Sequence, residues 1–325
     1  MYYFIINPAS AKGSGRNTWN ELMPLIEEEH VPYRRYYTEK DRGADLIMEK
    51  LLGKDRDEIT VFVMGGDGTV NSFLHGMRAY EKAHPDDDPF KRVKLAYVPV
   101  GSANDMAKAL EYPEKPADAF LSVMDKLKNG VFRKMDIGSL TYIDPESESL
   151  KDEIRYFAVS CGMGFDASVC AEAMNSKMKK VLNGIGLGKL SYGGISIKQL
   201  MTSHMPDMEV ITDGETRNVK SCMMVTVMNH KYQGGGVMFT PDAVDDDGKL
   251  DFLYTEEMKR ADVAKILPKA YSGAHVGTPG IVIGTTEEIR IKSPDPLYVH
   301  TDGEVETRAK EILVKVCPGR LTFAG

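Results

Sequence analysis

One carboxylate lies among three glycines in the stretch VFVMGGDGTVNSFLHGM, residues 61–77. The apolar run before it, Val61 to Met64, is typical of a strand that is buried on both faces. After it, apolar residues recur at helical spacing from Val70 to Met77, which predicts a helix starting near Thr69. The group Gly65, Gly66, Asp67 and Gly68 therefore occupies a turn between a strand and a helix.

Such a turn suits the binding of phosphate, because glycines adopt backbone angles closed to other residues and let a ligand approach the main chain. A helix N-terminus adds unpaired N–H groups and a positive dipole end. Asp67 cannot bind phosphate directly, since like charges repel, so it needs an intervening cation such as Mg²⁺ or a hydroxyl nucleophile to orient. The alternative is a plain glycine-rich turn in which Asp67 caps the helix.

Three other polar turns follow predicted strands in the first 135 residues. NPASAKGSGR (7–16) follows the strand 2–6, Thr38 follows 33–37, and GSAND (101–105) follows 93–100. Helices predicted at about 18–29, where Pro24 kinks the helix or delays its start, and at 43–52 alternate with these strands. This alternation predicts a parallel sheet with helices on both faces, whose ligands bind at the carboxyl ends of the strands. The four turns therefore predict one site.

The residues of these turns leave alternatives open. NPASAKGSGR has Lys12 and Arg16 as charges for a phosphate, but it lacks the order of a Walker A loop and the third glycine of a dinucleotide-binding turn. Ser102 and Asn104 are predicted to cap the following helix, which is a structural explanation for GSAND.

The pattern changes near residue 136, where strand-like and hairpin-rich segments begin. We predict an α/β domain over 1–135 and a mostly β domain over 136–308. In the second, NHKYQGGGVMFTPDAVDDDGKLD (229–251) carries an acidic cluster that either holds Mg²⁺ or forms a solvated hairpin. VHTDGEV (299–305) places Asp302 and Glu304 around a glycine, in a typical Asp-Gly hairpin turn.

The segment 173–206 contains no acidic residue, and its lysines are interleaved with apolar side chains. A basic and apolar segment can settle on an anionic membrane surface. A pair of helices covering the β domain explains it equally well. Its lysines are Lys177, Lys179, Lys180, Lys189 and Lys198.

Composition limits the classes of function. A formal net charge of −7 argues against a nucleic-acid partner, and 42% hydrophobic with 27% charged residues argues against disorder. The four cysteines form no CxxC pair, which fits a reducing cytoplasm. The N-terminus reads as a first strand and not as a signal peptide, and no apolar run has membrane-spanning length. We therefore expect a cytoplasmic protein that meets a membrane only from outside.

The motifs GGDGTVN, PVGSANDMAKAL, GGGVMFTPDAVDDDGKLD and DGE, in this order, resemble those of the diacylglycerol kinase catalytic family. This family of lipid kinases includes sphingosine and ceramide kinases and is distantly related to NAD kinases and phosphofructokinases. The resemblance spans nearly the whole chain, with Ser102 at a position that is usually threonine. It implies an α/β domain that binds ATP and a C-terminal β-sandwich, with a last strand at about 309–325 that returns to the first domain.

The resemblance also implies site residues. Glu304 would be the general base, Asp67 would act at the phosphates of Mg·ATP, and Asp302 belongs to the same catalytic motif. A structural Mg²⁺ would be held by Asp247 and the carbonyls of Val244 and Lys249. The residues expected to line ATP are Asn7, Thr38, Gly65, Gly66, Asp67, Gly68, Thr69, Val70, Asn71 and Ser102.

The expected activity is the transfer of the γ-phosphate of ATP to diacylglycerol or a related lipid alcohol, at the inner face of the membrane. We expect peripheral contact through 173–206 and also consider a homodimer. The alternatives are a kinase for a small molecule, resembling NAD kinase, and a non-catalytic sensor of lipid or nucleotide.

Overall fold

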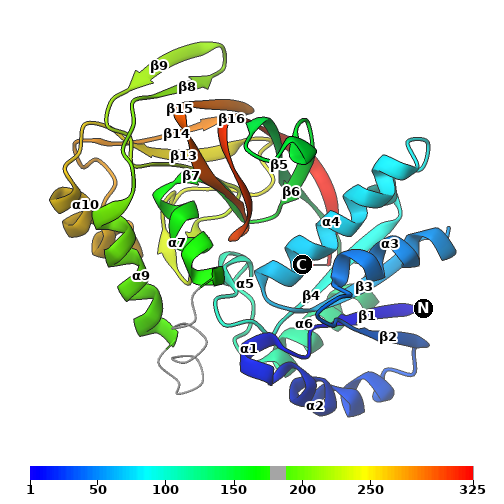
Figure 1. The fold of residues 1–325 in the computed structure, drawn as a ribbon. Coiled ribbons are helices and arrows are strands. Elements are labelled where there is room, and N and C mark those ends of the chain that lie inside the picture. Colours follow the sequence, from blue (N-terminus) through cyan, green and yellow to red (C-terminus); the bar gives the residue numbers. More distant parts are fainter. Residues whose placement is uncertain (176–187, 325) are drawn as a thin grey trace. The chain divides into compact units, whose positions relative to one another are not determined.

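The computed structural model describes residues 1–175 and 188–324, which form two compact units (Figure 1). Unit 1 contains Met1–Ile137 and Pro318–Gly325, and unit 2 contains Gly138–Cys317. The chain therefore leaves unit 1 within strand β5 (Arg133–Pro145) and returns within the long strand β16 (Glu304–Phe323).

The sheet of unit 1 is parallel and has the order β4-β3-β1-β2. Its strands are β1 (Tyr2–Ile6), β2 (Tyr33–Tyr37), β3 (Ile59–Gly65) and β4 (Val93–Pro99). The end of β16 extends this sheet, because Thr322 and Phe323 pair with β4 in parallel. Helices alternate with the strands: α1 (Ser10–Gly13), α2 (Gly15–Glu28), α3 (Ala44–Lys54), α4 (Asp67–Ala83), η1 (Pro89–Lys91), α5 (Asp105–Ala109) and α6 (Pro116–Lys128).

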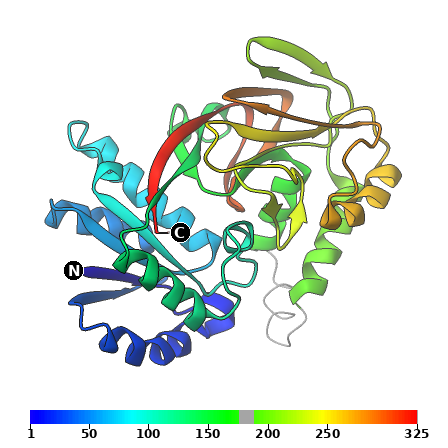
Figure 2. The same cartoon turned by 180° about the vertical axis from the view of Figure 1, so that it is seen from behind.

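Both faces of this sheet are covered, as Figures 1 and 2 show for α3 and α4 on one face and α2 and α6 on the other. Alternate strand residues Phe4, Phe62 and Val98 form one buried cluster with Trp19 of α2 and Phe120 of α6. Their neighbours in sequence are also buried and face the other layer of helices. Unit 1 thus has the predicted three-layer α/β architecture. Helix α2 begins at Gly15, before the predicted start near Thr18, and continues through Pro24, so Pro24 does not delay its start.

Unit 2 is built on antiparallel strands in the order β14-β13-β10-β7-β15-β16, with the hairpin β8-β9 on β15. The strands are β6 (Ile154–Phe157), β7 (Ser160–Gly164), β8 (Met208–Thr212), β9 (Glu215–Val219), β10 (Met224–Met228), β11 (Tyr232–Gln233), β12 (Val237–Met238), β13 (Leu250–Thr255), β14 (Ile281–Thr286) and β15 (Glu288–Thr301). Its helices are η2 (Glu148–Leu150), α7 (Phe165–Asn175), α9 (Gly188–Thr202), α10 (Arg260–Ile266) and η3 (Leu267–Ser272). The predicted change from α/β to mostly β structure is confirmed.

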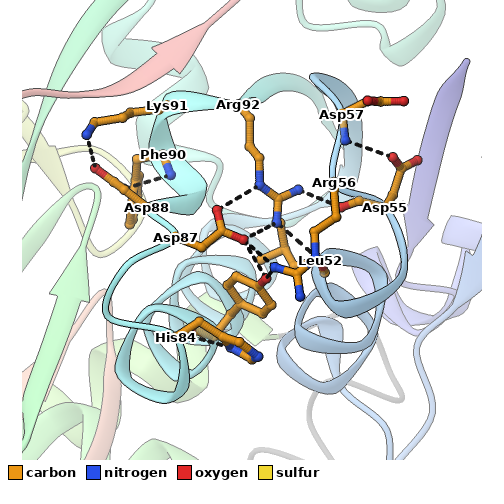
Figure 3. Close-up of polar contacts among 11 residues, drawn as sticks. Leu52, Asp55, Arg56, Asp57, His84, Asp87, Asp88, Phe90, Lys91 and Arg92 are labelled. Atoms are coloured by element: carbon orange, nitrogen blue, oxygen red, sulfur yellow. Dashed lines mark hydrogen bonds and ion pairs between the residues drawn. The ribbon is translucent and has the colours of Figure 1, made fainter.

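A polar network ties the amino ends of β3 and β4 to the helices beside them (Figure 3). The Arg92 guanidinium donates to the Asp55 carbonyl at 2.6 Å and lies 3.3 Å from the Asp87 carboxylate. Asp87 also accepts from the Tyr80 hydroxyl at 2.7 Å and pairs with Arg56 at 2.5 Å. The hydrogen bond from Tyr80, with those from the two arginines, lowers the pKa of Asp87 to about 2. This network lies at the opposite edge of the sheet from the predicted turns.

Candidate functional site

The four polar turns of unit 1 lie at one edge of its sheet. The strand register pairs Ile6 with both Tyr37 and Met64, and Gly65 with Pro99, so all four strands end at the same level. Main-chain hydrogen bonds continue past these ends, from Thr38 N–H to the Ile6 carbonyl at 2.8 Å and from Asn7 N–H to the Met64 carbonyl at 2.9 Å. Parallel strands place their carboxyl ends together, and this register does so here.

Close packing explains the glycines of the GGDGT turn. A Cβ at Gly65 would lie 2.2 Å from Thr69 Oγ1, and a Cβ at Gly101 would lie 2.5 Å from the Gly66 Cα. Gly66 has φ −100° and ψ −172°, an extended conformation open to any residue. None of Gly65, Gly66 and Gly68 has a positive φ, so the expectation that these glycines serve special backbone angles is wrong. Gly65 leaves room for Thr69, and Gly66 and Gly101 let the GGDGT and GSAND turns touch through their main chains.

Asp67 lies in the first turn of α4 and connects two of the turns. Its carboxylate accepts the N–H of Asp105 at 2.9 Å and the N–H of Met106 at 3.2 Å, which are the first N–H groups of α5. Neither Ser102 nor Asn104 forms the predicted side-chain cap, because Asn104 has φ 51° and donates to the Gly101 carbonyl instead. Asp67 caps α5 from another turn, and this fixes the carboxylate at the sheet edge.

The other predicted nucleotide residues differ in what they expose. Asn7 Nδ2 donates to Thr69 Oγ1 at 3.1 Å, which joins the first turn to the third. Gly68 and Ser102 are exposed, whereas Val70 and Asn71 are buried at 0% and 1% exposure. Val70 packs in the core with its side chain, so only its main chain could face a nucleotide.

Of the two basic residues predicted to face a phosphate in the loop 7–16, the structure describes the side chain of Arg16. The Arg16 guanidinium lies over the Tyr37 ring, 5.6 Å from its centroid. The side chain of Lys12 lies outside the described part of the chain.

In unit 2, Asp302 and Gly303 form the turn between β15 and β16. Both have positive φ, 49° and 86°, and Thr301 pairs with Glu304 across the turn, as in a two-residue type I′ hairpin. The Asp302 carboxylate accepts the N–H groups of residues 158, 159 and 160 at 2.8–3.0 Å. Glu304, the first residue after the Asp302-Gly303 turn, is exposed. Asp302 thus anchors a turn that presents Glu304, and a catalytic role for either residue stays a prediction.

The acidic hairpin of unit 2 brings three carboxylates together. Asp247 accepts the N–H of Lys249 at 2.9 Å, and Val244 is 46% exposed. Burial, followed by the charges of Asp247 and Asp242, raises the pKa of Asp251 to about 7. Within residues 1–175 and 188–324, no three His, Cys, Asp or Glu side chains are arranged to hold a metal ion. A hard cation such as Mg²⁺ would need carbonyl oxygens as ligands in addition to these carboxylates. The negative charge of the carboxylates suits such a cation.

The basic segment 173–206 is described only in part. Lys177, Lys179 and Lys180 lie outside the described residues, as does the side chain of Lys189. Lys198 pairs with Glu172 of α7 at 2.5 Å, and this pair with Gln199 lowers the pKa of Glu172. The positive charge of Lys198 is therefore compensated by Glu172 within the protein.

Sequence patterns miss a buried polar cluster next to the Asp302 turn. It contains Asp166, Gln233 and His300, with His300 0% exposed. The available signal is the presence of polar residues in otherwise apolar segments, CGMGFDA and YVHTDG.

Comparison with known proteins gives matches in both halves of the chain. Residues 1–140 match the family described as the diacylglycerol kinase catalytic domain, and 159–325 match the YegS C-terminal NAD kinase beta sandwich-like domain. The Bacillus subtilis lipid kinase candidate YtlR is 25% identical, over 94% of this chain and 93% of that protein. A Staphylococcus haemolyticus diacylglycerol kinase is 23% identical, over 92% of this chain and 81% of that one.

Solved structures show the same fold. A candidate diacylglycerol kinase from Bacillus anthracis has a TM-score of 0.73 at 19% identity, covering 99% of this chain and 96% of that one. Yeast NADH kinase, solved with NADH, has a TM-score of 0.51 at 12% identity, covering 99% and 82%. The predicted family resemblance and fold class are confirmed.

Proposed function

The chain belongs to the diacylglycerol kinase catalytic family, and from this membership we propose that it transfers the γ-phosphate of ATP to the hydroxyl of diacylglycerol or a related lipid alcohol. The product would be phosphatidic acid or its analogue. The observation that carries the proposal is the edge of the unit 1 sheet, where the four polar turns come together. Residues 7, 38, 65–71 and 102 would bind ATP there.

In phosphoryl transfer the protein mainly positions the phosphate and neutralises its charge. Asp67, held by two main-chain N–H groups, would meet the magnesium ion of the Mg·ATP substrate. Glu304 would take the proton from the lipid hydroxyl as its oxygen attacks the γ-phosphorus and ADP leaves. Asp302 would keep the turn of Glu304 in place through its three hydrogen bonds.

A structural Mg²⁺ would be held in unit 2 by Asp247 with the carbonyls of Val244 and Lys249. Bound there, the cation would compensate the charge of the acidic hairpin. The buried carboxyl of Asp251 beside Asp247 supports this proposal.

The test is a thin-layer assay with labelled ATP against diacylglycerol, sphingosine, ceramide, phosphatidylglycerol and NAD. We expect phosphorylation of at least one lipid and none of NAD. Phosphorylation of NAD alone would favour the alternative, a kinase for a small molecule. This chain shares only its fold with yeast NADH kinase, at 12% identity. The absence of any turnover would favour a sensor.

Asp247→Ala should remove a Mg²⁺-dependent gain in thermal stability, since a ligand of the folded state stabilises it. Melting temperatures of the parent and the variant are compared with Mg²⁺ and with EDTA. Asp262→Ala, which removes a half-exposed acid of α10 that pairs with Lys265, is the matched control and should keep the gain. An equal response to Mg²⁺ in the Asp247 variant would leave the hairpin as a solvated turn.

Docking on a bilayer would use the described end of the basic segment. In the part of the chain that the structure describes, no helix is long and apolar enough to cross a membrane. Ile197 and Met201 of α9 are 67% and 64% exposed and lie one helical turn apart, whereas Leu200 is buried. They are candidates for shallow insertion into a bilayer and belong to the same sequence segment, 173–206, as the lysines.

Changing Ile197 and Met201 together to Ser should weaken vesicle binding by roughly tenfold or more, because insertion of each side chain contributes on the order of 1 kcal/mol. Activity on vesicle-borne lipid should fall with it, and activity on a short-chain soluble acceptor should not. Leu121→Ser, at an exposed apolar position of α6, is the control.

Changing Lys177, Lys179 and Lys180 to Gln should also weaken vesicle binding, most at low salt. Equal loss on both acceptors would argue against docking.

A further inference from the structure

A buried hydrogen-bonded pair lies beside the turn that presents Glu304. His300 Nε2 is 3.0 Å from Asp166 Oδ2, and the two residues are 0% and 6% exposed. Asp166 comes from the first turn of α7, and His300 from β15, two residues before Asp302. Gln233 of β11 completes the cluster, with its Nε2 3.5 Å from Asp166 Oδ2 and its Oε1 accepting from the Thr226 hydroxyl at 3.0 Å.

The hydrogen bonds fix which imidazole nitrogen carries the proton. The main-chain N–H of Gly303 donates to His300 Nδ1 at 3.2 Å, so Nδ1 is an acceptor. In the neutral imidazole Nε2 then carries the proton and donates to Asp166. The amide nitrogen of Gln233, 3.3 Å from His300 Nε2, is also a donor and forms no hydrogen bond to Nε2 in this tautomer. One imidazole thus joins a carboxylate on α7 to the glycine at the centre of the Asp302-Gly303 turn.

The surrounding chain leaves room for this pair. Gly162 of β7 lies opposite His300 in the sheet, and a Cβ there would be 2.2 Å from Asp166 Oδ2 and 2.9 Å from His300 Nε2. Any other residue at 162 would displace the carboxylate or the ring.

We propose that His300, oriented by Asp166, is a positioning residue that fixes Gly303 and thereby the carboxylate of Glu304. The inference rests on the proposed function for the role of Glu304 as the base. The turn is then held on two sides, at Asp302 by three N–H groups of residues 158–160 and at Gly303 by His300. A displacement of about 1 Å at a reacting group can cost on the order of 10²-fold in rate, which is reason enough to fix the turn twice.

Three substitutions test the roles of the two imidazole nitrogens separately. In His300→Asn the amide oxygen can occupy the place of Nδ1 and accept from Gly303, but the side chain no longer reaches Asp166. In His300→Gln the amide nitrogen can occupy the place of Nε2 and donate to Asp166, but the acceptor for Gly303 is lost. His300→Ala removes both.

We expect the Ala and Gln variants to lower kcat on lipid by roughly 10- to 100-fold, with unchanged ATP affinity measured by calorimetry. The Asn variant keeps the acceptor for Gly303 but loses the bond to Asp166, so its activity should lie between those of the parent and the Ala variant. Combined with Glu304→Gln, His300→Ala should lower kcat no further, because a positioning residue acts only through the group it positions. Multiplied losses, or an Asn variant as impaired as the Ala variant, would overturn the proposal.

Hydrogen exchange provides a readout that needs no substrate. The peptide 298–307 should exchange faster in the Ala and Gln variants than in the parent and the Asn variant. His275→Ala is the matched control: it removes another buried imidazole, 1% exposed and bonded to the Phe239 carbonyl at 2.9 Å, and should leave this peptide protected. If the parent phosphorylates no lipid, the proposed function fails, while exchange still decides whether His300 holds the turn. Unchanged exchange in the Ala variant would contradict the inference.

Discussion

Replacing Asp67 with alanine is expected to lower kcat by roughly 10²–10³ while the protein remains folded, as for other preorganised charges at phosphoryl-transfer sites. The physical reason is the fixed position of this carboxylate. It lies at the carboxyl end of β3, and its two oxygens accept the N–H groups of Asp105 and Met106. Steady-state kinetics on the preferred lipid provides the measurement.

Asp67→Asn separates charge from capping, since an amide oxygen still accepts one of these hydrogen bonds but carries no charge. It should lose nearly as much activity as the alanine variant. Asp87→Ala is the control in the same unit: it breaks the network of Figure 3, at the opposite edge of the sheet. That variant should melt at a lower temperature and keep its kcat. Normal turnover in the asparagine variant would reduce Asp67 to a helix cap.

The strands of unit 1 could be predicted because their residues are buried on both faces or lie between clear turns. Tyr2–Ile6 and Tyr33–Tyr37 have the predicted bounds, and β3 contains the apolar run 61–64 and extends it to Ile59 and Gly65. Helix α5 follows the predicted GSAND turn, and Asn104 takes a left-handed conformation just before it. Local patterns carry this much information because periodicity reflects burial directly.

Unit 2 shows where local patterns fail. Two strand-like stretches of the sequence, EEIRIKS (287–293) and PLYVHT (296–301), are joined in the single strand β15, whose pairing with β16 shifts register between Lys292 and Leu297. Pro294 and Pro296 lie in this shift. Proline has no N–H to donate, and at an irregular position of the ladder none is required. Strand β14 was not predicted, because its sequence IVIGTT follows a glycine-rich stretch that resembles a loop.

The meeting of the four turns could be predicted from topology, since parallel strands bring their carboxyl ends to one edge. The side-chain contacts could not. Asp67 bonds to main-chain groups 38 and 39 residues away, and Asp166 and His300 are 134 residues apart. Such pairs leave no periodic trace in a single sequence, because they depend on how distant strands and helices pack.

Glu304→Gln is expected to lower kcat on lipid by roughly 10²–10⁴, the usual contribution of a positioned general base. The amide has nearly the same shape as the carboxylate but cannot take the proton of the lipid hydroxyl. The Asp302-Gly303 turn should remain intact, because the bonds from the N–H groups of residues 158–160 to Asp302 and from Gly303 to His300 do not involve residue 304. ATP affinity should therefore be unchanged, so that the loss is in kcat alone.

The neighbouring acid of the same strand gives a matched control. Glu306 lies two residues further along β16, so both side chains point to the same face of the strand, and Glu306 pairs with Arg155 at 2.8 Å. Glu306→Gln makes the same change in charge and should keep kcat within about twofold, since an exposed ion pair contributes little. If both variants lose activity equally, the effect comes from the local charge. If only Glu304→Gln is impaired, but the loss is in KM for the lipid while kcat is unchanged, the residue binds the lipid and does not act as its base.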